Sequence, residues 1–372
     1  MNDQLERLNR LPLRSNLRGL TPYGAPQLDV PILLNVNENT HGVPADVRAA
    51  IAAAVTEAAA GLNRYPDREF TDLRRALAEY LGHGLDASNL WAANGSNEVL
   101  QQILQAFGGP GRTALGFPPT YSMYPLLASG TDTRYITGER AGNYDLSAES
   151  AARQVRELQP NIVFLCSPNN PTGTGLGLDV VEAVYDAGAE SQTIVIVDEA
   201  YHEFAHEGTP SALTLLPGRE RLIVSRTMSK AFALAGARLG YMAAAPEVTD
   251  ALRLVRLPYH LSAITQATAL AALEHREALM AEVEDIKKQR DRIVEGLTRM
   301  GLTPAASDSN FVFFGGLENP HQVWQELLDA GVLIRDVGIP GHLRVTAGTE
   351  AETTAFLTSL ERILAGQAAL PA

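Results

Sequence analysis

Three short runs decide the fold: NIVFLC at residues 161–166, TIVIV at residues 193–197 and LIVS at residues 222–225. Each run is rich in β-branched residues and apolar on both faces, which is typical of parallel strands that helices cover on both sides. Helical patterns at residues 147–158 and 178–190 separate these runs from their neighbours. The alternation of strand and helix predicts an α/β fold with a mostly parallel central sheet and helices on both faces.

Outward from these runs, the chain divides into an arm and two domains. Residues 1–34 carry four prolines, which interrupt regular elements, so we expect an irregular arm there. Residues 35–258 form the predicted large domain. Its first helical patterns lie at residues 46–60, 70–81 and 97–107.

Residues 259–372 form the predicted smaller α+β domain, and we expect the arm to pack with it. The pattern begins with one long helical stretch, residues 262–300, which is rich in Ala, Glu, Lys and Arg. It continues with a strand at residues 311–314, a helix at residues 322–330, a strand pair around Leu333 and Leu343, and a final helix.

Composition and charge exclude several classes of function. The chain has 372 residues, of which 45% are hydrophobic and 20% charged, as in globular proteins. Its 43 acidic residues outnumber 30 Lys and Arg residues, and the net charge of −13 disfavours binding to nucleic acid or to an anionic membrane. A single cysteine excludes an internal disulfide framework. The N-terminus is polar, and no apolar run approaches the roughly 20 residues that span a bilayer, so we expect a soluble, cytoplasmic protein.

Two motifs resemble known sites without the context that those sites require. Residues 202–206 read HEFAH, which matches the H-E-x-x-H pattern of zinc proteases. The motif follows directly on a strand run, and Gly208 and Pro210 leave no room for a helix, so we predict no metal site. The glycines of residues 173–177 lack the spacing of a dinucleotide-binding loop. Cys166 lies inside an apolar run, and we expect a core residue there rather than a nucleophile.

Polar side chains follow each of the three strand runs, at the point where the strand ends. They are Asn170 in SPNNPTG, Asp198 and Tyr201 in DEAY, and Ser229 and Lys230 in RTMSK. In open α/β sheets, ligands bind beyond the carboxyl ends of the strands, so these groups should share one rim. Each alone has an ordinary explanation as a turn residue or a solvated charge, but their joint occurrence indicates a site.

This set of groups matches what pyridoxal phosphate requires. A lysine forms a Schiff base with the cofactor, and an acid keeps its pyridine nitrogen protonated. Asn and Tyr side chains hydrogen-bond its phenolic oxygen. Hydroxyls, an arginine such as Arg238 and the N-terminus of a helix hold its phosphate. Such a helix N-terminus is predicted at residues 95–98, which read GSNE.

The chain resembles the fold-type I aminotransferases of class I and II over nearly its whole length, and within them the histidinol-phosphate aminotransferase group. The motifs shared across the class are SPNNPTG (167–173), DEAY (198–201) and SK-x7-R (229–238). The motifs that point to the narrower group are TPY (21–23), NRYPD (63–67) and RTMSKAFALAGARLGY (226–241). The resemblance implies a large domain that binds pyridoxal phosphate and a smaller α+β domain.

The resemblance also implies roles for individual residues at the cofactor. Lys230 carries the cofactor and moves a proton, Asp198 pairs with the pyridinium, and Tyr201 with Asn170 holds the phenolic oxygen. Tyr121 stacks on the ring. The residues implied for the cofactor phosphate are Ser96, Asn97, Thr227, Ser229, Arg238 and Tyr65, the last reaching over from the second subunit of a homodimer with shared sites.

For the substrates, the resemblance implies that Arg344 binds the carboxylate of glutamate or 2-oxoglutarate. Tyr23, Asn37 and Arg335 are candidates for the phosphate end of the amino donor, although Arg335 beside Asp336 also fits an ordinary surface arginine. The implied reaction converts L-histidinol phosphate and 2-oxoglutarate into imidazole acetol phosphate and L-glutamate, in L-histidine biosynthesis.

Three alternative functions share the scaffold. The nearest is an aromatic amino-acid aminotransferase, which acts on phenylalanine or tyrosine. A pyridoxal-phosphate decarboxylase would keep the same ring contacts and release carbon dioxide. A non-catalytic regulator is the alternative from another class, and the intact Lys230 argues against it.

The chain departs from the family pattern at three places. Thr40 and His41 stand where a proline is usual, Asn97 where an aspartate is common, and His260 where an asparagine is common. These positions lie near the expected substrate-facing arm or subunit interface. They therefore bear on substrate specificity rather than on the type of reaction.

Overall fold

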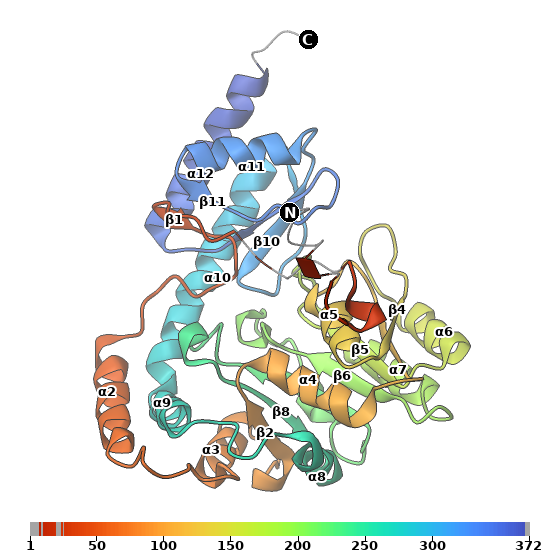
Figure 1. The fold of residues 1–372 in the computed structure, drawn as a ribbon. Helices are drawn as coiled ribbons and strands as arrows, with labels where there is room; N and C mark the ends of the chain where they lie inside the picture. Colours follow the sequence, from red (N-terminus) through yellow and green to blue (C-terminus); the bar gives the residue numbers. More distant parts are fainter. Residues whose placement is uncertain (1–6, 9, 20–23, 25, 369–372) are drawn as a thin grey trace.

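The structure is a computed structural model that describes residues 7, 8, 10–19, 24 and 26–368. In this part of the chain, a seven-stranded sheet forms the centre of the molecule (Figure 1). Its strands, in spatial order, are β2 (Leu90–Ala93), β8 (Gly240–Ala244), β7 (Leu222–Thr227), β6 (Ile194–Asp198), β5 (Ile162–Cys166), β3 (Thr113–Gly116) and β4 (Arg134–Thr137). Among these strands only β8 runs in the direction opposite to the others, so the predicted α/β class with a mostly parallel sheet is confirmed.

The three apolar runs of the sequence form β5, β6 and β7, side by side in the middle of this sheet. Every residue of these three strands is buried, so side chains on both faces of the sheet are covered. The outer strands β2, β3, β4 and β8 were not among the predicted runs. They are four or five residues long and contain Ala, Gly, Arg or Thr, so they lack a strong hydrophobic signal.

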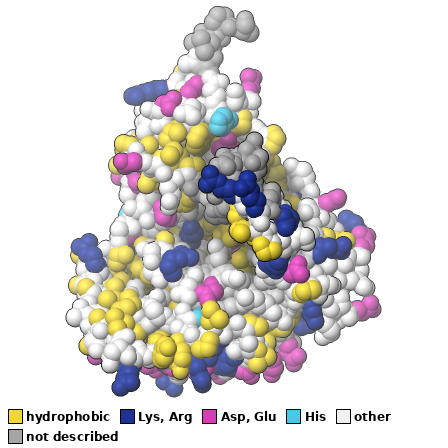
Figure 2. Space-filling view, in the orientation of Figure 1, with side chains coloured by type: hydrophobic (Ala, Val, Ile, Leu, Met, Phe, Trp, Pro, Cys, Tyr) yellow, Lys and Arg dark blue, Asp and Glu magenta, His cyan; other side chains and the backbone are white. Residues whose placement is uncertain are grey.

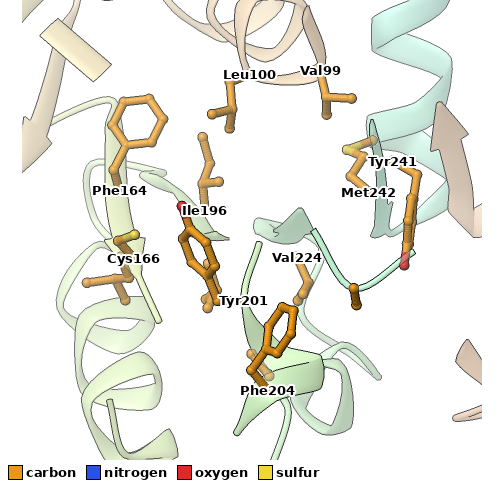
Figure 3. Close-up of a cluster of buried hydrophobic side chains, with 14 of the residues drawn as sticks. Val99, Leu100, Phe164, Cys166, Ile196, Tyr201, Phe204, Val224, Tyr241 and Met242 are labelled. Carbon is orange, nitrogen blue, oxygen red and sulfur yellow. The ribbon is translucent and has the colours of Figure 1, made fainter. Parts of the chain in front are cut away.

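Helices connect the strands and cover the sheet. They are α2 (Ala45–Ala59), α3 (Thr71–Leu81), α4 (Ser96–Phe107), α5 (Met123–Gly130), α6 (Ala148–Leu158), α7 (Leu178–Ala187) and α8 (Pro246–Val255). Short 3-10 turns are η1 (Ser15–Leu17), η2 (Ala87–Asn89), η3 (His202–Phe204), η4 (Ala212–Leu215) and η5 (Ala235–Ala237). Figure 3 shows Val99 and Leu100 of α4 on one side of Ile196 and Val224, with Phe204 on the other. The core therefore continues from helix through sheet to loop.

The C-terminal part of the chain forms a second, smaller layer beside the large sheet (Figure 1). Helix α9 (Ala263–Glu274) still packs against α2 and α3 beside the large sheet. The elements that follow it are α10 (Arg276–Arg299), β9 (Thr303–Pro304), β10 (Phe311–Gly315), α11 (Pro320–Asp329), β11 (Val332–Leu333), β12 (Leu343–Thr346) and α12 (Glu350–Ala368). Strands β12, β10 and β9 form an antiparallel sheet. The division of the chain into an arm and two domains stays a prediction.

One prediction for this part of the chain was wrong. The helical stretch 262–300 is two helices, because the backbone leaves helical geometry at His275, with φ −108° and ψ 23°. Helix α9 packs against α2 and α3, whereas α10 runs on to the smaller sheet, so packing in two directions imposes the break. The predicted strand pair around Leu333 and Leu343 is present as an antiparallel bridge between Arg335 and Arg344, whereas the strands beside this bridge have other partners. Strand β11 pairs with β1 (Ile32–Leu33), and β12 pairs with β10.

The face of the molecule seen in Figure 2 carries both acidic and basic side chains. Within the described ranges, every helix is too short or too polar to cross a lipid bilayer.

Candidate active site

A cavity of about 360 Å³ opens beyond the carboxyl ends of β5, β6 and β7. Its wall comes from both layers of the molecule, since residues 35–38 and 335–337 line it together with the strand ends. The predicted site residues that line the cavity are Asn37, Ser96, Asn97, Tyr121, Asn170, Asp198, Tyr201, Thr227, Ser229, Lys230, Arg238, Arg335 and Arg344. The fold thus brings together residues that are up to 307 positions apart in the chain, from Asn37 to Arg344.

Lys230 places its amine inside this cavity. The Nζ atom donates a hydrogen bond to the Val36 carbonyl at 3.0 Å. Burial, together with the positive charges of Arg344 and Arg238, lowers the pKa of the amine to about 8. A minor but substantial fraction of the amine is therefore neutral close to physiological pH, and the neutral amine is the form that attacks carbonyl carbon and accepts protons.

Asp198, at the end of β6, is a buried carboxylate on the cavity floor. Tyr124 donates a hydrogen bond to Oδ2 at 2.8 Å, and Ser225 donates one to Oδ1 at 3.1 Å. Burial raises the pKa of this carboxyl above its ordinary value, while the two hydrogen bonds act in the opposite direction. Neither hydroxyl neutralises the charge, so a cation bound beside Asp198 would stabilise the ionised form.

Tyr201 and its partners form one wall of the cavity. The phenol oxygen accepts hydrogen bonds from Asn37 Nδ2 at 3.0 Å and from Asn170 Nδ2 at 3.4 Å. Burial raises the pKa of Tyr201 to about 12, so the phenol stays protonated and keeps a proton to donate. Arg344 donates to Asn170 Oδ1 at 2.6 Å, which orients the amide. Asn37 is fixed in turn by Thr346, whose hydroxyl accepts from the Asn37 backbone N–H at 3.1 Å.

An anion-binding cradle lies at the N-terminus of α4. Gly95, with φ +86°, precedes the helix and provides no side-chain cap, so the first backbone N–H groups face outward. A Cβ at Gly95 would lie 2.5 Å from Arg238 Nη2, so only glycine lets the guanidinium approach the helix end this closely. Ser229 and Thr227 line the same region. A helix N-terminus, an arginine and two hydroxyls are the donor set expected for a phosphate.

Directly after the end of β6, a buried ion pair joins Glu199 to Arg226 of β7. Arg226 Nη2 lies 2.8 Å from Glu199 Oε2, and both side chains are less than a tenth exposed. Arg226 also lies 3.3 Å from Glu203. The pair fixes the two strands that carry Asp198 and Thr227 relative to one another.

One of the predicted residues that the structure describes does not line the cavity of this chain. Tyr65 is 79% exposed and stacks on Tyr259, with ring centroids 4.4 Å apart. Tyr23 lies outside the described residues. The predictions also missed Tyr124 and Ser225, which contact Asp198 directly. The local sequence around Tyr124 contains no signal for the first, because its contact with Asp198 joins residues 74 positions apart.

The two deceptive motifs are explained by their packing. His202 belongs to the single turn η3, whereas His206 lies beyond it and hydrogen-bonds Asp308 at 2.7 Å. In the described part of the chain, no three His, Cys, Asp or Glu side chains gather as metal ligands would. The glycine loop packs against Ser307 and Asp308 rather than opening into a ligand site. Burial raises the pKa of Cys166 to about 12, so its thiol stays protonated and is a poor nucleophile.

The residues present fit pyridoxal phosphate by their chemistry. A neutral amine suits its aldehyde, a buried carboxylate suits its protonated ring nitrogen, and the protonated phenol of Tyr201 suits its phenolic oxygen. The cradle at Gly95 suits its phosphate. The cavity therefore contains one group for each polar end of the cofactor.

Comparisons with known proteins agree with this reading. Residues 29–360 match the sequence model of the family "Aminotransferase class I and II". A histidinol-phosphate aminotransferase of Paenarthrobacter aurescens is 84% identical over 368 residues, which cover 99% of both chains. One from Thermobifida fusca is 57% identical, with 95% of both chains covered. The crystal structure of histidinol-phosphate aminotransferase from Sinorhizobium meliloti in complex with pyridoxal-5'-phosphate is similar at a TM-score of 0.85 and 26% identity, covering 96% of this chain and 98% of that one.

Proposed function

Because this chain belongs to the class I and II aminotransferase family, we propose that it transfers the amino group of L-histidinol phosphate to 2-oxoglutarate with pyridoxal phosphate as cofactor. The products are imidazole acetol phosphate and L-glutamate, and the reaction serves L-histidine biosynthesis. The observation that carries the proposal is the cavity, in which a lysine amine, a buried carboxylate, a phenol and an anion cradle meet. Identities of 84% and 57% to histidinol-phosphate aminotransferases disfavour the alternative of an aromatic amino-acid aminotransferase.

When bound, the cofactor supplies an aldehyde that links to amines and a ring that withdraws electrons from the substrate α-carbon. Lys230, whose amine has a pKa of about 8, would hold the cofactor through its aldehyde, and the neutral amine would accept and return the proton of the substrate α-carbon. Asp198 holds the ring nitrogen in its protonated form. Tyr201 and Asn170 hold the phenolic oxygen through the hydrogen-bonded wall.

Binding of the charged ends falls to the arginines and the helix N-terminus. Ser96, Asn97, Thr227, Ser229 and Arg238 hold the cofactor phosphate in the cradle, and Tyr121 covers the ring. In the substrate region, the carboxylate of 2-oxoglutarate binds at Arg344, and the phosphate of the amino donor binds near Arg335, Asn37 and Tyr23. These groups concentrate positive charge in a molecule whose net charge is −13.

We further propose that the enzyme is a cytoplasmic homodimer whose subunits complete each other's sites. Tyr65 faces solvent in this chain. The apolar side chains of Leu254, in α8, and of Leu257, just after this helix, are 86% and 74% exposed. Exposed apolar groups of this size mark a surface that a partner covers. We expect Tyr65 on that surface to reach the cradle of a second subunit.

The decisive test combines labelling with a panel of amino donors. Borohydride reduction of the loaded enzyme should fix the cofactor on the peptide that contains Lys230, and Lys230→Ala should lose both this label and turnover. Lys288→Ala, on an exposed part of α10, is the matched control and should keep both. L-histidinol phosphate should be converted in preference to phenylalanine. A Lys230→Ala variant that is still labelled, or a preference for phenylalanine, would overturn the proposal.

A further inference from the structure

Tyr124 is the side chain through which helix α5 contacts the acid of the site. It is completely buried, and its hydroxyl donates to Asp198 Oδ2 at 2.8 Å. The ring is clamped between two aromatic neighbours. It stacks on Phe164 of β5, with centroids 4.4 Å apart and an interplanar angle of 7°. Its other contact is the edge-to-face packing with Tyr121, at 5.4 Å and 88°. The hydroxyl therefore has little freedom to move away from Asp198.

Ser225 provides the second donor, from the other side of the carboxylate. Strands β6 and β7 pair in parallel with Asp198 opposite Ser225, so the sheet register holds the serine hydroxyl 3.1 Å from Oδ1. Each carboxylate oxygen thus accepts one hydroxyl hydrogen bond. The backbone N–H of Ala200 also acts on this carboxylate, and since each carboxylate oxygen has two lone pairs, the group keeps acceptor capacity for a ligand in the cavity.

We propose that the hydroxyls of Tyr124 and Ser225 are positioning groups that keep Asp198 ionised and aimed at a protonated ring nitrogen of the cofactor. This inference rests on the proposed function, since it assumes that the cavity binds pyridoxal phosphate. Burial alone favours the neutral acid, and a neutral acid would not attract the pyridinium. The hydrogen bonds of Tyr124 and Ser225 lower the pKa of Asp198 against this burial effect. They therefore oppose its protonation before the cofactor arrives.

The test compares two cofactors that differ only at the ring nitrogen. Cofactor-free enzyme is titrated with pyridoxal phosphate and with its 1-deaza analogue, in which a C–H group replaces the nitrogen. The wild-type chain should bind pyridoxal phosphate more tightly, and the ratio of the two dissociation constants measures what Asp198 contributes at the nitrogen. In Tyr124→Phe this ratio should fall about tenfold, which corresponds to about 1.4 kcal/mol. Ser225→Ala tests the other oxygen in the same way and should also lower the ratio.

Tyr241→Phe is the matched control. Tyr241 is likewise completely buried in the large sheet, but its hydroxyl has no hydrogen-bond partner, so its removal should leave the ratio unchanged. A purely structural role for Tyr124 would weaken the binding of both cofactors equally and leave the ratio at the wild-type value. That result in both Tyr124→Phe and Ser225→Ala would overturn the inference while the proposed function stands. A wild-type chain with no preference between the two cofactors would instead overturn the assigned role of Asp198 itself.

Discussion

Gly240 is the position where a single methyl group should disturb the cofactor cradle most. It is the first residue of β8 and pairs with Ala93 on one side and Thr227 on the other. An added Cβ would lie 2.0 Å from the backbone nitrogen of Ser96 and 2.3 Å from the carbonyl carbon of Gly95. Both contacts are with backbone atoms, so no side-chain rotation relieves them. In Gly240→Ala the N-terminus of α4 must move.

The size of this movement follows from the contact distance. Non-bonded carbon contacts are optimal at about 3.5 Å, so the backbone of Ser96 must retreat by roughly 1.5 Å. Overpacking of this kind costs about 1–3 kcal/mol in the free energy of unfolding. A displacement of about 1 Å in a binding group costs on the order of 100-fold in reaction rate. We therefore expect Gly240→Ala to lose at least about tenfold in affinity for pyridoxal phosphate, beyond its loss of stability.

Two measurements separate these effects. Urea denaturation of the cofactor-free protein gives the change in stability, and titration with pyridoxal phosphate gives the change in affinity. Gly130→Ala is the control, because Gly130 ends α5 with nothing within 4 Å of an added Cβ. It should match the wild type in both measurements. The reasoning is refuted if Gly240→Ala binds the cofactor as tightly as Gly130→Ala does.

Three further predictions concern charge. Because burial lowers the pKa of Lys230 to about 8, the rate at which the enzyme binds pyridoxal phosphate should rise with pH up to about 8 and then level off. A rate–pH curve with its inflection above pH 10 would contradict this prediction. Burial lowers the pKa of His260 below its ordinary 6.5, so the unfolded chain binds a proton that the folded chain does not, and stability is lost as pH falls below 6.5. In urea denaturation at pH 7.5 and pH 5, His260→Asn should therefore lose less unfolding free energy between the two pH values than the wild type does. An equal loss in both proteins would contradict this prediction. Arg226→Met leaves the buried carboxylate of Glu199 without its ion pair and should lower the free energy of unfolding by about 3–5 kcal/mol. Arg219→Met breaks the partly exposed pair with Glu182 and should lower it by at most about 1 kcal/mol. Equal losses in urea denaturation of the two variants would contradict the argument.

The centre of the fold and the rim of the site were predictable from local sequence. The runs that became β5, β6 and β7 are hydrophobic on both faces, and the side chains that follow them had to meet at one edge of a parallel sheet. Asp198 and Lys230 were identified in this way, before any resemblance was used. Their positions depend on the short stretches of chain around them and on the fact that the carboxyl ends of parallel strands meet at one edge of the sheet.

Contacts that depend on packing between distant elements were not predictable in this way. Tyr124 reaches Asp198 from a helix that lies 74 residues earlier, and nothing in its local sequence fixes that approach. The break at His275 arises because α9 and α10 pack in different directions, and the sequence there contains no glycine or proline. Strand β11 pairs with β1 from the beginning of the chain, so its partner could not be found among neighbouring residues.

The link between Asn37 and Thr346 has a consequence for how the protein is made. These residues are 309 positions apart, and a ribosome adds about 5–20 residues per second, so Asn37 waits between about 15 and 60 s for its partner. During that time the large sheet can form, but the wall that holds Tyr201 remains unfinished. A nascent chain truncated before Thr346 therefore lacks a closed cavity. Tight capture of the cofactor by ribosome-bound chains would thus report that synthesis is almost complete.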